Sequence, residues 1–285
     1  MMTLNYEKTV SYGVPIWKTI LNMTPQERCS VDHIYGVIAA SPRFHFLCEV
    51  LQLDQNILES PENKTIFISS FIHNSFVNET DQSNLQSYER AEFLGDSILQ
   101  FILSSHLMKA YPELNEGQLS KLRSSLVNED SLAEIASSVG LVELLISGKG
   151  NQTHKLDQSD AIKADLFESL LGALYQIYGL EFTKDAFMRM IHFYEDKTEQ
   201  KFFDLSRLQL FDPKSTLQEF VLKETKELPK YEVEEKLIDG ETHFYCKVFE
   251  KDILLGSGSG LSKKLAQKKA AKNAITNKES KYYIK

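Results

Sequence analysis

The stretch ERAEFLGDSIL, residues 89–99, places two acidic residues inside an apolar segment with helical spacing. We expect a helix from Glu89 to Leu107, on which Glu92 and Asp96 are four residues apart and share one face. Apolar residues flank both acids, which predicts that their carboxylates lie at the edge of a core. Partly buried carboxylates without a partner shift toward the neutral form, and a bound cation removes that penalty.

A second acid pair lies in the helix expected from Ala161 to Tyr178, where Asp165 and Glu168 are three residues apart. Four oxygen ligands from two packed helices form the kind of site that Mg²⁺ prefers. Gly95 and Gly172 lie beside the acids. Because glycine within a helix costs about 1 kcal/mol relative to alanine, we interpret both as permitting close helix approach. Spacing alone leaves open the alternative that the four acids are ordinary solvent-facing residues.

The length and the residue pattern indicate two domains. A chain of 285 residues is long enough for two independent cores. Helical spacing without convincing alternation between residues 40 and 200 predicts an all-α first domain, whereas the pattern after residue 212 predicts a small α+β domain. We expect an N-terminal extension of unknown role at 1–40, the helical domain at 41–205, a linker at 206–211 and the α+β domain at 212–279.

The α+β domain is expected to run helix, three strands, helix. After its first helix the pattern predicts strands at 231–237, 244–248 and 253–255, a turn at 239–240, a flexible glycine-rich loop at 256–260 and a terminal helix at 263–275. On that last helix, lysines recur every four residues along one side and alanines occupy the other, at Lys264, Lys268 and Lys272 and at Ala266, Ala270 and Ala274. The lysine stripe suits phosphate binding, and the alanines suit close packing on a sheet.

The charge is distributed unevenly along the chain. The net charge is −8, but residues 212–285 carry 15 Lys and 12 acidic residues, so this part is net +3 and the remainder is net −11. This asymmetry predicts a polyanion that is held by one part and acted on by acids in the other, although a merely solvated lysine-rich tail is the alternative. The three widely spaced cysteines, and the absence of a leader or spanning pattern, favour a soluble cytoplasmic protein without membrane association.

Several of these segments resemble the ribonuclease III family. Residues 89–99 resemble its signature ERLEFLGDxxL, and DLFESLLGAL at 165–174 resembles its second signature. Residues 116–127 and 72–76 are similar to its middle segment and its early helix. Ala91, Tyr88 and Asn74 depart from the usual Leu, Asn and Arg, and none of these departures removes a ligand.

The resemblance covers roughly residues 45–280 and implies an all-helical, homodimeric endonuclease domain. It implies Mg²⁺ as the cofactor, with Mn²⁺ able to substitute, held by Glu92, Asp96, Asp165 and Glu168. Glu89 and Glu116 match auxiliary acids of the family. Phe93 matches its dimer-interface aromatic residue, and a plain core phenylalanine is the alternative for this position.

The second domain resembles a double-stranded RNA-binding domain through DPKSTLQE at 212–219 and GSGSGLSKK at 256–264. Such domains contact 2′-hydroxyls in two successive minor grooves and phosphates across the intervening major groove. The resemblance implies groove contacts from Ser215, Gln218, Glu219 and His243, and phosphate contacts from Lys263, Lys264 and Lys268. Gln267 stands where a third lysine is common.

Together these features predict an enzyme of RNA processing, including ribosomal RNA processing, that hydrolyses double-stranded RNA with divalent metal ions. The family likeness implies products with 5′-phosphate and 3′-hydroxyl ends. A two-metal site can do without a protein nucleophile or an imidazole base, so His73 and His106 are expected to be structural, and no nucleotide cofactor is expected. The alternative is a catalytically inactive RNA-binding or ribosome-associated protein on the same scaffold.

Overall fold

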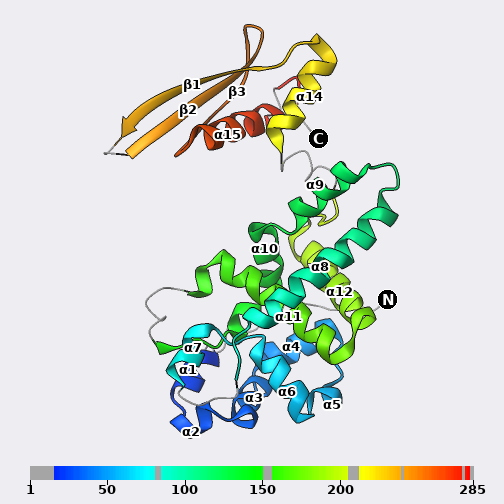
Figure 1. Cartoon of the computed structure of the whole chain (residues 1–285), viewed down its shortest axis with the longest axis vertical. Coiled ribbons are helices and arrows are strands. Elements are labelled where there is room, and N and C mark those ends of the chain that lie inside the picture. Colours follow the sequence, from blue (N-terminus) through cyan, green and yellow to red (C-terminus); the bar gives the residue numbers. More distant parts are fainter. Residues whose placement is uncertain are drawn as a thin grey trace. The chain divides into compact units, whose positions relative to one another are not determined.

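The computed structural model describes residues 16–80, 85–149, 156–204, 212–238, 241–277 and 280–282, and the chain forms two compact units, Met1–Phe202 and Phe203–Lys285 (Figure 1). The predicted linker at 206–211, the predicted turn at 239–240 and residues 1–15 of the predicted extension lie outside the described residues.

The first unit is built from helices. In chain order they are α1 (Ile16–Leu21), α2 (Pro25–Arg28), α3 (Val31–Ala39), α4 (Pro42–Leu51), α5 (Gln55–Leu58), α6 (Pro61–Ser69), α7 (Asn74–Glu79), α8 (Glu89–Ala110), α9 (Glu116–Leu126), α10 (Glu129–Val139), the 3₁₀ helices η1 (Leu141–Leu144) and η3 (Leu156–Gln158), α11 (Asp160–Tyr178) and α12 (Leu180–Thr198). Among the described residues of this unit, β pairing is limited to one isolated bridge between Ile72 and Ile146. The predicted all-α architecture is therefore confirmed.

Helices α8 and α11 form the centre of the first unit and pack on each other more extensively than any other described helix pair (Figure 1). Two glycines explain the close crossing. A Cβ atom on Gly95 would lie 1.7 Å from the backbone oxygen of Glu168, and one on Gly172 would lie 2.0 Å from that of Ala91. The predicted role of both glycines is confirmed, and the two acid-bearing helices touch backbone to backbone at this point.

The described part of the predicted extension, residues 16–40, belongs to the first unit. Helix α1 packs on α3 and η1, and α3 packs on α4 and α6. Their buried side chains are apolar and are Ile16, Ile20, Ile34, Tyr35 and Ile38. The physical role of this segment is therefore to cover α4, α6 and η1 with further apolar surface.

The second unit contains α14 (Pro213–Thr225), β1 (Lys230–Ile238), β2 (Glu241–Glu250), β3 (Ile253–Gly260) and α15 (Lys263–Thr276). The strands form an antiparallel sheet in the order β1-β2-β3, and α14 and α15 pack on each other (Figure 1). Ala266, Ala270 and Ala274 are fully buried in the core of this unit, whereas Lys264, Lys268 and Lys272 are exposed. The predicted division of α15 into an alanine side and a lysine side is confirmed.

The predicted glycine-rich loop at 256–260 is wrong, because these residues form the second half of β3. Gly256 pairs with Val248 and Gly258 with Cys246 in the ladder with β2. A Cβ atom on Gly256 would lie 2.6 Å from the backbone oxygen of Ala270, and one on Gly258 would lie 2.4 Å from the backbone nitrogen of the same residue. The glycines therefore serve close packing of α15 on the strand rather than flexibility.

Residues after α15 complete the second unit. Tyr282 is buried, stacks on Phe220 with a centroid distance of 6.3 Å, and donates a hydrogen bond of 2.8 Å from its hydroxyl to Glu250. Lys281 bridges Glu250 at 3.2 Å and Glu224 at 2.8 Å. Glu250 is only 6% exposed, so these donors stabilise a carboxylate that would otherwise be buried alone.

None of the helices in the described ranges is both long enough and apolar enough to cross a membrane.

A candidate metal centre and a candidate RNA-binding surface

The crossing of α8 and α11 brings the four predicted acids into electrostatic range of one another. Glu92, Asp165 and Glu168 are half-buried and Asp96 is exposed. Burial and the other three carboxylates raise the pKa of Glu168 from its ordinary 4.5 to about 8. Burial, followed by the charges of neighbouring carboxylates, raises the pKa of Glu92 to about 6. Burial also raises the pKa of Asp165.

Burial is the largest cause of all three shifts, and neighbouring carboxylates add to it. A bound divalent cation would offset both contributions. The donor set also fits Mg²⁺, because it consists of carboxylate oxygens, the ligands that this ion prefers. In the described ranges no three His, Cys, Asp or Glu side chains approach closely enough to hold an ion together. The four acids therefore share an electrostatic environment without forming a closed set of ligands.

The two auxiliary acids lie in different places. Glu89 accepts hydrogen bonds from the Asn74 amide at 3.3 Å and from the Ser87 hydroxyl at 3.2 Å, and its charge contributes to the raised pKa values of Glu92 and Asp165. Glu116 begins α9 and accepts a hydrogen bond of 3.1 Å from Ser120. The structure brings Glu89 into electrostatic range of Glu92 and Asp165. The auxiliary role of Glu116 stays a prediction.

Three further side chains at the site are not predicted from the sequence. Tyr88 donates a hydrogen bond of 3.2 Å to Oδ2 of Asp165, and Gln100 donates one of 3.2 Å to Oδ1 of Asp96. The charge of Glu129, at the start of α10, contributes to the raised pKa of Asp165. An acid in the first turn of a helix is common for reasons of helix electrostatics, so the sequence around Glu129 carries no distinguishing signal.

Phe93 is 78% exposed, so the alternative of a plain core phenylalanine is wrong. It lines a pocket of about 400 Å³ between α6 and α8, and the other lining residues are Thr65, Ile66, Ser69, Gln86, Ser87, Arg90, Ala91, Leu94 and Gln176. A large aromatic side chain exposed beside a pocket is typical of an interaction surface.

The predicted RNA-contacting residues lie on three elements of the second unit. Ser215 and Gln218 are half-buried and Glu219 is exposed, all on α14, and His243 is half-buried on β2. Lys263, Lys264 and Lys268 are exposed on α15.

Neighbouring side chains shape this end of the second unit. The ammonium group of Lys263 lies 5.8 Å from the centre of the Phe244 ring. The amide oxygen of Gln267, which stands where a third lysine is common, accepts a hydrogen bond of 2.9 Å from Lys214. The ammonium group of Lys214, on α14, is therefore held beside the lysines of α15.

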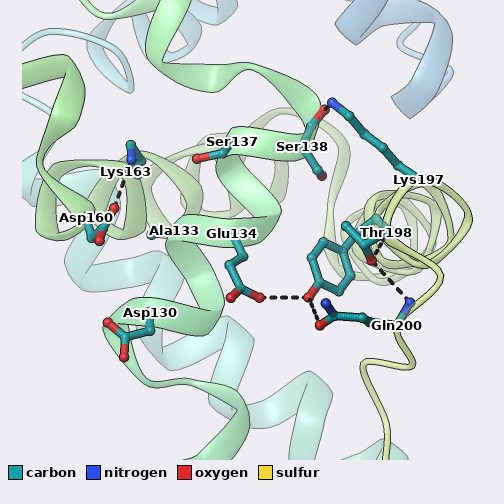
Figure 2. A pocket seen from close by; sticks show the side chains of 11 residues that line it. Asp130, Ala133, Glu134, Ser137, Ser138, Asp160, Lys163, Lys197, Thr198 and Gln200 are labelled. Carbon is teal, nitrogen blue, oxygen red and sulfur yellow. Dashed lines mark hydrogen bonds and ion pairs between the residues drawn. The ribbon is translucent and has the colours of Figure 1, made fainter.

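A separate pocket of about 660 Å³ lies between α10, the start of α11 and the end of α12 (Figure 2). Its polar groups bind one another: the hydroxyl of Tyr194 donates to Glu134 at 2.7 Å, and Lys163 bridges Asp160 at 2.8 Å. Lys197 donates to the backbone oxygen of Ser138 at 2.9 Å. The four acids and the predicted RNA-contacting residues are not among the residues that line it.

Comparisons with known proteins agree with this arrangement. Residues 63–193 match the family described as Ribonuclease-III-like, and residues 213–278 match the double-stranded RNA binding motif. Ribonuclease 3 of Bacillus licheniformis is 35% identical over 225 residues, which cover 79% of this chain and 87% of that protein. Ribonuclease 3 of Protochlamydia amoebophila is 33% identical over 244 residues, 85% of this chain and 98% of that protein. The nuclease domain of ribonuclease III from Campylobacter jejuni is similar in structure, with a TM-score of 0.45, 28% identity and coverage of 56% of this chain and 99% of that domain. The chain belongs to the ribonuclease III family.

Proposed function

We propose that this chain is an endoribonuclease that cleaves double-stranded RNA by metal-dependent hydrolysis of phosphodiester bonds. The observation that carries the proposal is the backbone-to-backbone crossing of α8 and α11, which brings Glu92, Asp96 and Asp165 near enough to Glu168 to add to the effect of burial on its pKa. Half-buried carboxylates gathered in this way are expected to bind a divalent cation. The residues that would hold Mg²⁺, or Mn²⁺ in its place, are Glu92, Asp96, Asp165 and Glu168, with Glu89 as an auxiliary acid.

When bound, divalent ions supply an activated water and neutralise the charge that develops on phosphorus. The protein's own contribution is to fix the carboxylates on two rigid helices. Glu92 and Asp96 share one face of α8, and Asp165 and Glu168 share one face of α11. Glu116, at the start of α9, is proposed as a second auxiliary acid. Products with 5′-phosphate and 3′-hydroxyl ends follow from the family likeness.

The second unit is proposed to hold the duplex. Lys263 and Lys264 begin α15, and Lys268 is one turn further along the same helix. Exposed ammonium groups bind phosphates at little desolvation cost, and the positive end of the helix dipole adds to the attraction. The half-buried Ser215, Gln218 and His243 present shorter polar groups that suit contacts in the minor groove.

A homodimer is part of the proposal. Phe93 is exposed beside a pocket on α8, and a second copy of the chain would cover this apolar surface. Two active centres, one from each subunit, would then cut both strands of a duplex. We place the enzyme in the cytoplasm, with a role in RNA processing that includes ribosomal RNA precursors.

Incubation of duplex RNA with the purified chain tests the proposal. We expect cleavage with Mg²⁺ or Mn²⁺ and none with EDTA. Glu168→Gln should abolish cleavage and leave duplex binding unchanged, because the lysines lie in the other unit. Glu134→Gln is the matched control, since it changes an exposed acid of the same unit, and this variant should cleave like the parent protein. Equal cleavage by Glu168→Gln, or no metal-dependent product from the parent protein, would favour the inactive RNA-binding alternative.

A further inference from the structure

Tyr88 immediately precedes α8 and departs from the asparagine that is usual in the family signature. The backbone of Tyr88 is itself helical, with φ −63° and ψ −17°, which is not the extended conformation in which a residue before a helix caps it with its side chain. In the described part of the chain, the Tyr88 side chain makes no capping hydrogen bond to α8. The Tyr88 side chain is therefore free of any capping role at the start of the helix that carries Glu92 and Asp96.

The Tyr88 side chain instead reaches across to the other acid-bearing helix. Its hydroxyl donates a hydrogen bond of 3.2 Å to Oδ2 of Asp165, a residue 77 positions later in the sequence. Asparagine is several atoms shorter than tyrosine, so this contact depends on the longer side chain. The hydrogen bond connects the first residue before α8 with a carboxylate on α11.

The position of the Tyr88 ring is fixed from several sides. Tyr88 is only 5% exposed, and its backbone N–H donates to the backbone oxygen of Ile72 at 2.8 Å. The His73 ring packs against the Tyr88 ring in an edge contact with a centroid distance of 5.9 Å. His73 is itself held, because its backbone N–H donates to Ile146 at 2.8 Å. A hydroxyl on so constrained a ring has little freedom to leave Asp165.

We infer that Tyr88 is a positioning residue that holds the Asp165 carboxylate in the orientation from which it binds the divalent cation. The inference rests on the proposed function. A carboxylate has two oxygens, and a donor that occupies Oδ2 restricts rotation of the whole group. Hydrogen-bonding partners of metal ligands commonly contribute about tenfold or more to metal affinity by this means.

The test measures binding of Mn²⁺ alone, by the electron paramagnetic resonance of the free ion, to the full chain without RNA. Tyr88→Phe removes only the hydroxyl and keeps the buried ring. We expect it to weaken Mn²⁺ binding by about tenfold. Tyr88→Asn restores the residue that is usual in the family and should show a similar loss, because it lacks the reach to Asp165. High Mn²⁺ concentrations should restore RNA cleavage by Tyr88→Phe.

Tyr194→Phe is the matched control, because the Tyr194 hydroxyl also donates to a carboxylate, that of Glu134, in the same unit. It should bind Mn²⁺ like the parent chain. Parent-like Mn²⁺ affinity in a folded Tyr88→Phe chain, when Glu168→Gln has lost binding, would overturn the inference and leave the proposed function intact. Equal Mn²⁺ binding by the parent chain and by Glu168→Gln would overturn the inference about Tyr88 and the proposed metal-dependent function together.

Discussion

The two units of this protein place their functional charges in opposite environments. In the first unit, three of the four acids are half-buried between apolar helices, and burial raises the pKa of Glu168 to about 8. In the second, the lysines of α15 are exposed, and the buried side of the same helix consists of alanines and Ile275. Desolvated carboxylates favour a cation that replaces their lost water, whereas solvated ammonium groups attract a polyanion at long range. The stability of the first unit should therefore depend on divalent metal ions and on pH, and duplex binding by the second unit should depend on the salt concentration.

The largest effect is expected where the two acid-bearing helices cross. Gly95→Ala would place a Cβ atom 1.7 Å from the backbone oxygen of Glu168, and the collision can be relieved only by separating α8 from α11. We expect the first unit to lose about 3 kcal/mol of stability or more, together with its metal binding. Thermal unfolding and Mn²⁺ titration measure both losses.

The control for this change is Gly36→Ala in the middle of α3, where a new Cβ atom would meet nothing within 4 Å. It should raise stability by about 0.4–1 kcal/mol, because alanine is the better helix former. Equal effects of the two substitutions would show that the close crossing is not what holds the acids together.

A smaller effect is expected on the RNA-binding side. Replacing Lys263, Lys264 and Lys268 with alanine should weaken duplex binding and lower the salt dependence of the binding constant, by about one unit of the logarithmic slope for each phosphate that is no longer neutralised. Fluorescence anisotropy at several salt concentrations measures this slope. Lys230→Ala, which removes a lysine paired with Glu232 at 2.8 Å on β1, should leave the slope unchanged. Mn²⁺ binding should not change in either variant.

The smallest effect concerns pH. The folded chain holds a proton on Glu168 up to about pH 8, whereas the unfolded chain releases it near 4.5. Between these values the folded state binds more protons, so stability from this group decreases as the pH rises. In EDTA, the unfolding temperature of the first unit should fall from about pH 5 to about pH 8. Saturating Mg²⁺ should reduce that fall, and Glu168→Gln should leave only the smaller part that Glu92 and Asp165 contribute. An unfolding temperature that rises over this range would contradict the assigned shift.

Much of the fold follows from the sequence because local and tertiary preferences agree. The predicted helix from Glu89 corresponds to α8, and the helix predicted from Ala161 to Tyr178 corresponds to α11. Gly140 ends α10 with a positive φ of 71°, the left-handed conformation in which glycine commonly ends a helix. The close approach of the two acid-bearing helices is also predictable, because a glycine within an apolar helix indicates a point where another backbone comes near.

The errors arise where long-range packing overrides a local pattern. Glycines at 256–260 indicate flexibility when considered alone, but the strand needs them because α15 packs directly on its backbone. For Phe93 the local pattern leaves a core position and an interface position both open, and only the packing shows that it is exposed. In the sequence, Tyr88 stands out only as a departure from a signature, because its hydrogen bond to Asp165 joins segments far apart in the chain. Pattern analysis cannot supply such contacts.

The buried Glu250 has a consequence for any attempt to study the second unit in isolation. The sequence match to the RNA-binding motif ends at residue 278, but two donors to this carboxylate, Lys281 and Tyr282, come later. A fragment cut at the end of the recognised motif would keep the acid and lose both donors. Its weak expression or aggregation would then reflect a truncation artefact, and a usable fragment has to extend through Tyr282.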